Sequence, residues 1–143
     1  KRTSPPPSMM NFDAAGRETC IVRESRTNTP LQALNLMNDV TYLEASRKMA
    51  ERMMREGGTS PADRIAYGFR LATARLPRTN ETDVLLAGFG SQLDFYQTNS
   101  GAAAKLLSQG ESARDDKLPV NELAAYSTVA SLILNLDETI TKQ

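Results

Sequence analysis

Residues 120–136, VNELAAYSTVASLILNL, decide the fold. Apolar side chains lie on nearly every side of the helix that these residues predict, and a helix that is apolar all round is usually buried at the centre of a domain. The run is shorter than the roughly 20 residues that span a bilayer, and Ser131 and Asn135 interrupt it. It therefore predicts a central core helix, and a membrane span is excluded.

Strong boundary signals predict the helices that surround this core. The N-cap is Thr29, the first helical position is Pro30, and Gln32 completes a capping box with Thr29. The helical pattern that starts there ends at Gly57-Gly58. Helices are expected over 30–56, 61–76, 80–97 and 120–136, and 102–109 is a candidate for a short fifth one. No strand pattern competes with them, so we expect an all-α fold, an irregular orthogonal bundle of four to five helices.

Two polar regions are expected to face solvent. One is the charged side of helix 30–56. The other is the polar stretch 110–117, which is predicted to be an exposed loop. The residues expected to form the charged side of the helix are Arg47, Lys48, Glu51, Arg52 and Arg55.

The first 28 residues are expected to be extended. Pro5-Pro6-Pro7 disfavours helix, and Met9, Met10 and Phe12 form an apolar group that we expect to dock on the bundle. The predicted organisation is a Pro- and Arg-rich segment over 1–28 packed on a helical domain over 29–143. Because the chain opens with Lys1, it is expected to be a piece of a longer protein.

Composition excludes several classes of chemistry. Lys plus Arg and Asp plus Glu both number 17, so the basic excess typical of nucleic-acid binders is missing and no nucleic-acid partner is expected. The chain has no His, which excludes Ser-His-Asp catalysis, His-ligated zinc and Cys-x-x-Cys-His haem attachment within it. Its one cysteine, Cys20, cannot form an internal disulfide.

The sequence resembles a known family. The stretches SPPPSMMNFDAAGRETC, RTNTPLQALNLMND, RIAYGFRLATARLP and ELAAYSTVASLILNLDETITK look like the planctomycete-specific domain of unknown function. That family forms the C-terminal part of large secreted proteins that often carry cytochrome c modules upstream. The resemblance implies an extracytoplasmic location, periplasmic or secreted, and upstream domains as partners. Any haem would belong to those upstream domains, so no cofactor and no metal site is expected in this chain.

Three arginines, Arg17, Arg23 and Arg26, form one candidate anion-binding cluster, since guanidinium groups bind oxyanions in a bidentate way. The alternative is that Asp13, Glu18 and Glu24 pair with them. We favour local pairing, because surface charges are usually solvated or paired nearby.

A row of polar residues in and before the first helix forms the second candidate. Asn28, Gln32, Asn35 and Asn38 recur at helical spacing, with Asp39 next to them. This row could face a sugar or another domain, but we favour a polar seam that bonds the irregular backbone of residues 8–27.

Catalysis has weaker support. Two of the carboxylates Asp13, Glu18, Asp39 and Glu44 could act as acid and base on a glycosidic bond, but Asp39 is expected inside a helix, where ordinary hydrogen bonding is commoner. Cys20 is most simply a small buried residue. The spacing of the methionines favours core packing over haem ligation. No catalytic residue is therefore assigned.

These observations favour a non-catalytic helical scaffold or docking domain within a larger exported protein, and they lean against an enzyme in this chain. The alternatives are part of an enzyme site acting on a polysaccharide, and a carbohydrate- or anion-binding module completed by upstream domains. A low aromatic content of 6%, with no Trp, disfavours a surface that stacks on sugars.

Overall fold

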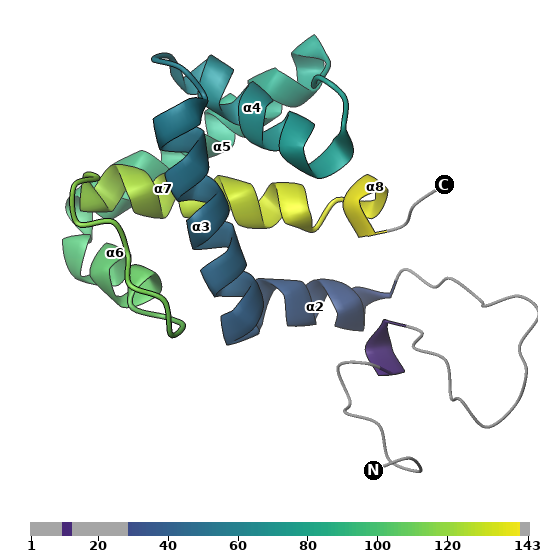
Figure 1. Cartoon of the computed structure of the whole chain (residues 1–143), viewed down its shortest axis with the longest axis horizontal. Coiled ribbons are helices and arrows are strands. Elements are labelled where there is room, and N and C mark those ends of the chain that lie inside the picture. Colours follow the sequence, from purple (N-terminus) through teal and green to yellow (C-terminus); the bar gives the residue numbers. More distant parts are fainter. Residues whose placement is uncertain (1–9, 13–28, 141–143) are drawn as a thin grey trace, which may run out of the picture.

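The computed structural model describes residues 10–12 and 29–140, and helix α7 (Val120–Leu134) lies at its centre. This helix contacts every other helix from α2 to α8 (Figure 1). Leu123, Ala125 and Val129 are completely buried in it. The central core helix predicted from its all-round apolar sequence is confirmed.

The fold is all-α, as predicted, and the described residues contain no strand. The described residues form more helices than the four to five expected, because α8 is added and the helix predicted over 30–56 is divided, while α6 corresponds to the candidate fifth helix over 102–109. Around α7 lie α2 (Pro30–Asn38), α3 (Val40–Glu56), α4 (Pro61–Thr73), α5 (Thr79–Thr98), α6 (Ser100–Leu107) and α8 (Asp137–Ile140). Helix α3 crosses α7 and does not run alongside it (Figure 1).

The prediction of a single helix over 30–56 is wrong, because the helix is interrupted at Asp39. This residue is extended, with φ −71° and ψ 132°, and it is both the C-cap of α2 and the N-cap of α3. Its carboxylate accepts a hydrogen bond from the Thr41 N–H at 2.8 Å. Asp competes in this way with helical hydrogen bonding, which is why it favours caps over helix interiors. Asp39 is therefore not inside a helix.

Helix α4 packs closely against α3 and ends earlier than expected. A Cβ on Gly68 would come within 2.6 Å of the Met53 sulfur, so any larger residue there would force the buried Met53 side chain to move. The helix ends at Thr73, three residues before the predicted end at residue 76, because Ala74 adopts the left-handed conformation with φ 61°. A left-handed residue after the last turn is a common helix stop, although glycine usually supplies it.

The charged side of α3 faces solvent only in part. Arg52 and Arg55 are exposed as expected, but Arg47 is 3% exposed and Glu51 is 4% exposed. The polar stretch 110–117, expected to be an exposed loop, lies within a longer loop over 109–118 that packs over these two side chains. The packing of this loop on α3 creates the first candidate site.

Candidate functional site

Carboxylates of α3 hold the backbone of the 109–118 loop. Glu44 accepts hydrogen bonds from the backbone N–H groups of Glu111 and Ser112, both at 2.9 Å, and Glu51 accepts one from Asp115 N–H at 3.2 Å. Hydrogen bonds from the Ser112 side chain and from these two N–H groups lower the pKa of Glu44 from 4.5 to about 2. The ionised carboxylate thus replaces the backbone partners that an irregular segment lacks.

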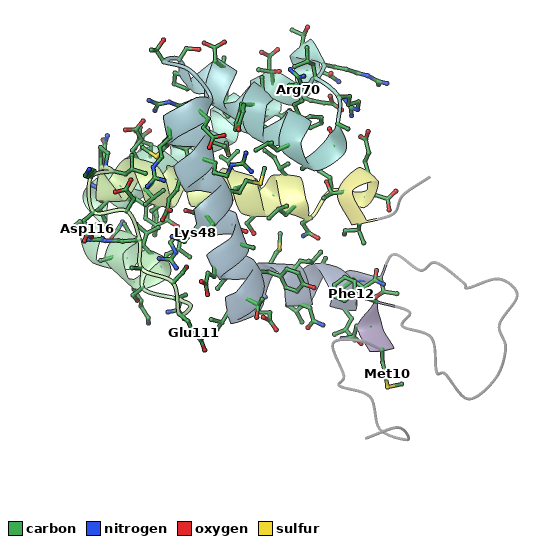
Figure 2. All side chains as sticks on the ribbon, viewed as in Figure 1. Met10, Phe12, Lys48, Arg70, Glu111 and Asp116 are labelled. Carbon is green, nitrogen blue, oxygen red and sulfur yellow. The ribbon has the colours of Figure 1, made fainter. Side chains whose placement is uncertain are left out.

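Cations of the same helix bond the carbonyl groups of the loop. Arg47 Nη2 donates to the Ser112 carbonyl at 2.7 Å and to the Ser112 hydroxyl at 3.2 Å. Lys48 Nζ donates to the Ala113 carbonyl at 2.6 Å and pairs with Glu51 at 3.0 Å. Further along α3, an ion pair joins Arg55 to Asp115. We call this set of contacts the α3–loop network; Figure 2 labels Lys48, Glu111 and Asp116 on this side of the molecule.

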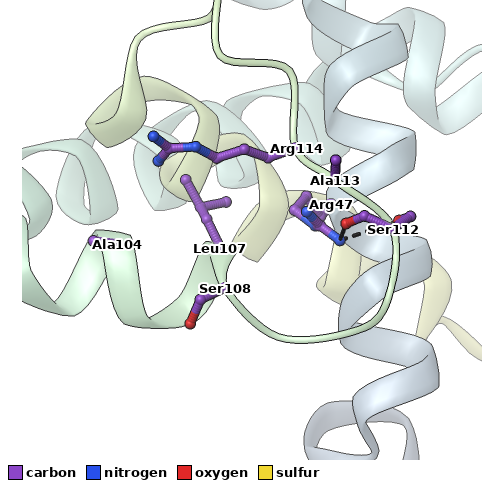
Figure 3. Close-up of a pocket in the computed structure, with 7 residues that line it drawn as sticks. All are labelled: Arg47, Ala104, Leu107, Ser108, Ser112, Ala113 and Arg114. Carbon is purple, nitrogen blue, oxygen red and sulfur yellow. Dashed lines mark hydrogen bonds between the residues drawn. The ribbon is translucent and has the colours of Figure 1, made fainter.

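Arg47 differs from the other cations of the network. It has no ion pair within the described part of the chain, and its buried Nε has no hydrogen-bond acceptor there. The side chain extends from α3 toward Ser112 and lines a pocket of about 260 Å³ between α3, α6 and the loop (Figure 3). A buried guanidinium whose donors are only partly satisfied is energetically costly, so this pocket is the strongest candidate site.

The other pocket walls are partly polar and partly apolar. Arg114 lies on one side and donates to Asp116 Oδ1 at 2.9 Å. Ser108, the C-cap of α6, donates its hydroxyl hydrogen to the Lys105 carbonyl at 2.9 Å. The remaining lining residues are Ala104, Leu107, Ser112 and Ala113. Since this lining contains two guanidinium groups and no carboxylate, it is suited to binding an anion and offers no acid–base pair.

A second pocket, of about 270 Å³, is mainly apolar. It lies beside α2 and α7, and its lining includes Met37, Leu43, Tyr96, Leu106 and Leu132. The Tyr96 hydroxyl is bonded to Thr128 at 3.3 Å. The lining residues include no ionisable group other than this tyrosine, so no general acid or base is placed in the pocket.

Exposed apolar side chains characterise helix α2. Leu31 is 50% exposed, Leu34 57% and Met37 43%. These three, which we call the α2 stripe, follow one another at intervals of three residues and are therefore neighbours on the helix surface. Met10, also exposed, points away from the body below α2 (Figure 2).

The predicted arginine cluster lies outside the described residues. Arg17, Arg23 and Arg26 belong to residues 13–28, as do Cys20, Asn28 and the carboxylates Asp13 and Glu18. Their assignment to anion binding or local pairing stays a prediction.

Within the predicted polar seam, Gln32 makes the expected hydrogen bond to the backbone of the N-terminal segment. It is 1% exposed, and its Nε2 donates to the Asn11 carbonyl at 2.6 Å. Beside it, the ring of Phe12 packs on Tyr42, with ring centroids 6.1 Å apart. Residues 10–12 are thus held against α2 and α3.

The other described members of the row make no such contact with residues 10–12. Asn38 is exposed and donates to the Leu34 carbonyl of its own helix at 2.8 Å. Asn35 is half-buried, and Asp39 is an exposed cap that lines neither pocket. The seam as a whole stays a prediction, because Asn28 lies outside the described residues.

Sequence reasoning missed Glu44, Arg47 and Glu51 as parts of a buried network. Their spacing of three and four residues places them on one face of α3, which was the available signal. Their partners lie more than 60 residues away in a loop with no regular pattern. Nothing local in the sequence connects the two.

A separate charged cluster lies just after the C-terminal end of α4 and joins this helix to α5 and α8. Arg75 pairs with Glu81 at 2.8 Å and with Glu138 at 2.7 Å, and its guanidinium lies 4.8 Å from the centre of the Phe69 ring. The Arg75 hydrogen bonds, with one from the Arg78 N–H, lower the pKa of Glu81 to about 2. Because every charge has a partner, this cluster is a clamp between α4, α5 and α8.

The described ranges, 10–12 and 29–140, contain no group of three or more His, Cys, Asp or Glu residues that could hold a metal ion. None of the helices there is long and apolar enough to cross a membrane.

The chain belongs to a family described as "PSD1: Protein of unknown function (DUF1553)", whose model matches residues 1–89. The match covers the N-terminal segment and helices α2, α3 and α4, and it extends into α5. It therefore includes the α2 stripe and the α3 half of the α3–loop network. No curated protein and no solved structure matches the chain.

Proposed function

We propose that this chain is a non-catalytic docking domain, and that the α2 stripe is the surface through which it binds another domain of the same polypeptide. The observation that supports this proposal is the exposure of Leu31, Leu34 and Met37 on a helix that projects from the bundle (Figure 1). Exposed apolar groups on neighbouring positions are typical of interaction surfaces.

The position of α2 supports docking. The helix contacts only α3 and α7 among the described helices, and its residues Gln32 and Leu36 are buried. A helix that is anchored on one side and apolar on the other can lie in a groove of a partner, with anchors at intervals of three or four residues.

The wider context is also part of the proposal. The domain belongs to a larger exported protein of the planctomycete type, located outside the cytoplasm, and haem-carrying domains upstream are the candidate partners. Support comes from the family resemblance of the sequence, in which such domains precede this one.

An alternative function is a part of an enzyme site acting on a polysaccharide, or a carbohydrate- or anion-binding module. Two observations weigh against the enzyme. Asp39 is an exposed cap outside both pockets, and Glu44 is already bonded to the loop backbone. Neither carboxylate is placed as an acid or base over a pocket.

Hydrogen exchange of α2 tests the docking proposal. In the longer polypeptide, the amides of residues 30–38 are expected to exchange more slowly than in this chain alone, because the partner covers α2. Leu34→Glu should remove that extra protection. The matched control is Val84→Glu, which changes a 71% exposed apolar residue of α5 and should leave it intact.

Equal exchange of α2 in the two contexts would contradict docking through this helix. Sedimentation of this chain alone provides the second outcome. If the chain forms dimers that Leu34→Glu disrupts and Val84→Glu does not, the partner of the stripe is a second copy of the chain and the proposed domain partner is incorrect.

A further inference from the structure

We infer that the pocket lined by Arg47 and Arg114 binds a small organic carboxylate. This site is separate from the α2 stripe and does not depend on the docking proposal. It also differs from the arginine cluster predicted in residues 17–26.

Arg47 is buried without a bonded counter-charge. Only 3% of the residue is exposed, yet it forms no ion pair with the described residues. Its hydrogen bonds to this part of the chain go to one residue, Ser112, through Nη2, and its buried Nε–H has no acceptor there. A charge removed from water in this way is stabilised by an opposite charge nearby, and a bound anion would provide one.

The nearby acids are already engaged. Glu44 attracts Arg47 electrostatically, but its oxygens accept the N–H groups of Glu111 and Ser112. Glu51 is paired with Lys48, and Asp116 with Arg114. Residues 10–12 and 29–140 therefore supply no bonded carboxylate to Arg47, while the open volume of about 260 Å³ lies directly beside it.

The surroundings of the pocket bear on the charge of the ligand. Around the pocket, the pairs Lys48–Glu51 and Arg114–Asp116 are balanced, and Glu44 offsets part of the charge of Arg47. The excess positive charge is thus small. Ser108 also places the C-terminal end of α6 at the pocket, and that end of a helix disfavours anions. A singly charged ligand fits this field better than a dianion such as sulfate.

The lining also bears on the shape of the ligand. Ala104 and Leu107 form an apolar wall of the pocket, and the Arg114 guanidinium points away from Arg47 (Figure 3). A carboxylate with a short hydrocarbon chain can place its charge at the Arg47 guanidinium, whose fork matches carboxylate geometry, and its chain against this wall. Inorganic anions carry no hydrocarbon group that could pack against this apolar wall.

Nuclear magnetic resonance of arginine side chains tests this assignment. The probe is butyrate, added to the protein at constant ionic strength while the Arg47 Nε–H and the amides of residues 107–114 are observed. We expect saturable shifts of these signals. Butyramide, which has the same shape without the charge, should cause no comparable shift.

Two variants locate the binding site. Arg114→Gln should weaken butyrate binding about 3- to 10-fold, as expected for loss of one charged contact. Arg70→Gln is the matched control, since Arg70 is an exposed arginine far from the pocket (Figure 2), and it should leave the affinity unchanged. Arg47→Gln should abolish the shifts, and Arg114→Gln keeps the test valid if that variant does not fold.

Three results would overturn the inference. Shifts that grow linearly with butyrate without saturating would show that no site exists. Equal shifts with butyramide would show an apolar pocket without charge recognition. Tighter binding of sulfate than of butyrate would show that the pocket selects inorganic dianions, which contradicts the carboxylate assignment.

Discussion

Helix α2 and the charged side of α3 follow one another in the chain, yet their side chains are distributed in opposite ways. In α2, Leu31, Leu34 and Met37 are exposed, whereas in α3 the ionic side chains of Arg47 and Glu51 are buried. A hydrophobicity pattern would place these two groups the other way round. The difference arises because α3 has a polar loop to satisfy and α2 has no such cover among the described residues.

The comparison shows what a buried charge requires. Each ionic group of the α3–loop network except Arg47 has either a charged partner or several backbone partners. Under those conditions, burial of a charge is tolerated, and the irregular loop obtains hydrogen bonds that no helix or strand provides. The loop and α3 are therefore expected to order together, while α2 contributes less to the stability of the fold.

A matched pair of methionines should show the largest difference between the two helices. Met53→Ala, in α3, removes a completely buried side chain and should lower the free energy of unfolding by about 2–5 kcal/mol. Met37→Ala, in α2, removes a side chain that is 43% exposed and should cost less than about 1 kcal/mol. Urea unfolding measures both, and similar losses would contradict the contrast between the helices.

The loss of a buried acid should have the next largest effect. Glu51→Ala removes the acceptor for Lys48 and Asp115 N–H, and it should cost about 1–3 kcal/mol because those donors lose a partner. The control, Glu56→Ala, removes an exposed acid of the same helix and should have a clearly smaller effect. If the two variants are equally stable in urea, the burial of the network has no energetic importance.

These two contrasts also show how far sequence reasoning reaches. Helix starts such as Thr29-Pro30 and Ser60-Pro61 are local signals, and the structure has caps at both positions. The apolar face of 120–134 is local too, which is why the central helix could be predicted. The break at Asp39 was missed because the helical pattern on both sides of it is strong.

The candidate pocket could not be predicted in the same way. Arg47 is one of seven charged residues on α3, and only its contact with Ser112, 65 positions away, distinguishes it. Packing over that distance depends on the path of α4, α5 and α6 between them. The arginines that attracted attention in the sequence, at 17, 23 and 26, were chosen because they are close together in the chain.

Substitution of Asp39, the residue that joins α2 to α3, should have an intermediate effect on the free energy of unfolding. Asp39→Ala removes the side-chain cap of α3 and should cost about 0.5–2 kcal/mol. Asp39→Asn is the control, since Asn caps helices about as well as Asp. Thermal or urea unfolding measures the two, and an Ala variant as stable as the Asn variant would show that the cap does not hold the joint.

Lowering the pH should weaken the α3–loop network, and this effect should be smaller than that of the Asp39 substitution. Because the pKa of Glu44 falls from 4.5 to about 2 on folding, its ionised form stabilises the native state above pH 4.5. That contribution is lost as pH falls from 4.5 toward 2. The stability difference between the natural chain and Glu44→Gln should therefore shrink over this range, as followed by urea unfolding. A constant difference would contradict the role assigned to Glu44.

The smallest effect is expected on the α2 stripe. Leu34→Ser should change the free energy of unfolding by no more than about 0.5 kcal/mol, because the side chain is 57% exposed. Leu36→Ser, two positions away and 8% exposed, is the control and should be strongly destabilising. A large loss for Leu34→Ser would show that the stripe supports the fold and is not available to a partner.

Asp39 has a mechanical consequence. One extended residue joins two helices whose ends it caps on both sides, so the direction of α2 depends on two backbone angles, φ −71° and ψ 132°. A nine-residue helix is about 13 Å long, and a small rotation at its base displaces its far end by several ångströms. The helix thus behaves as a lever with a single-residue pivot, and because α2 also contacts α3 and α7, substitutions at this pivot can re-aim α2 only together with a change in those contacts.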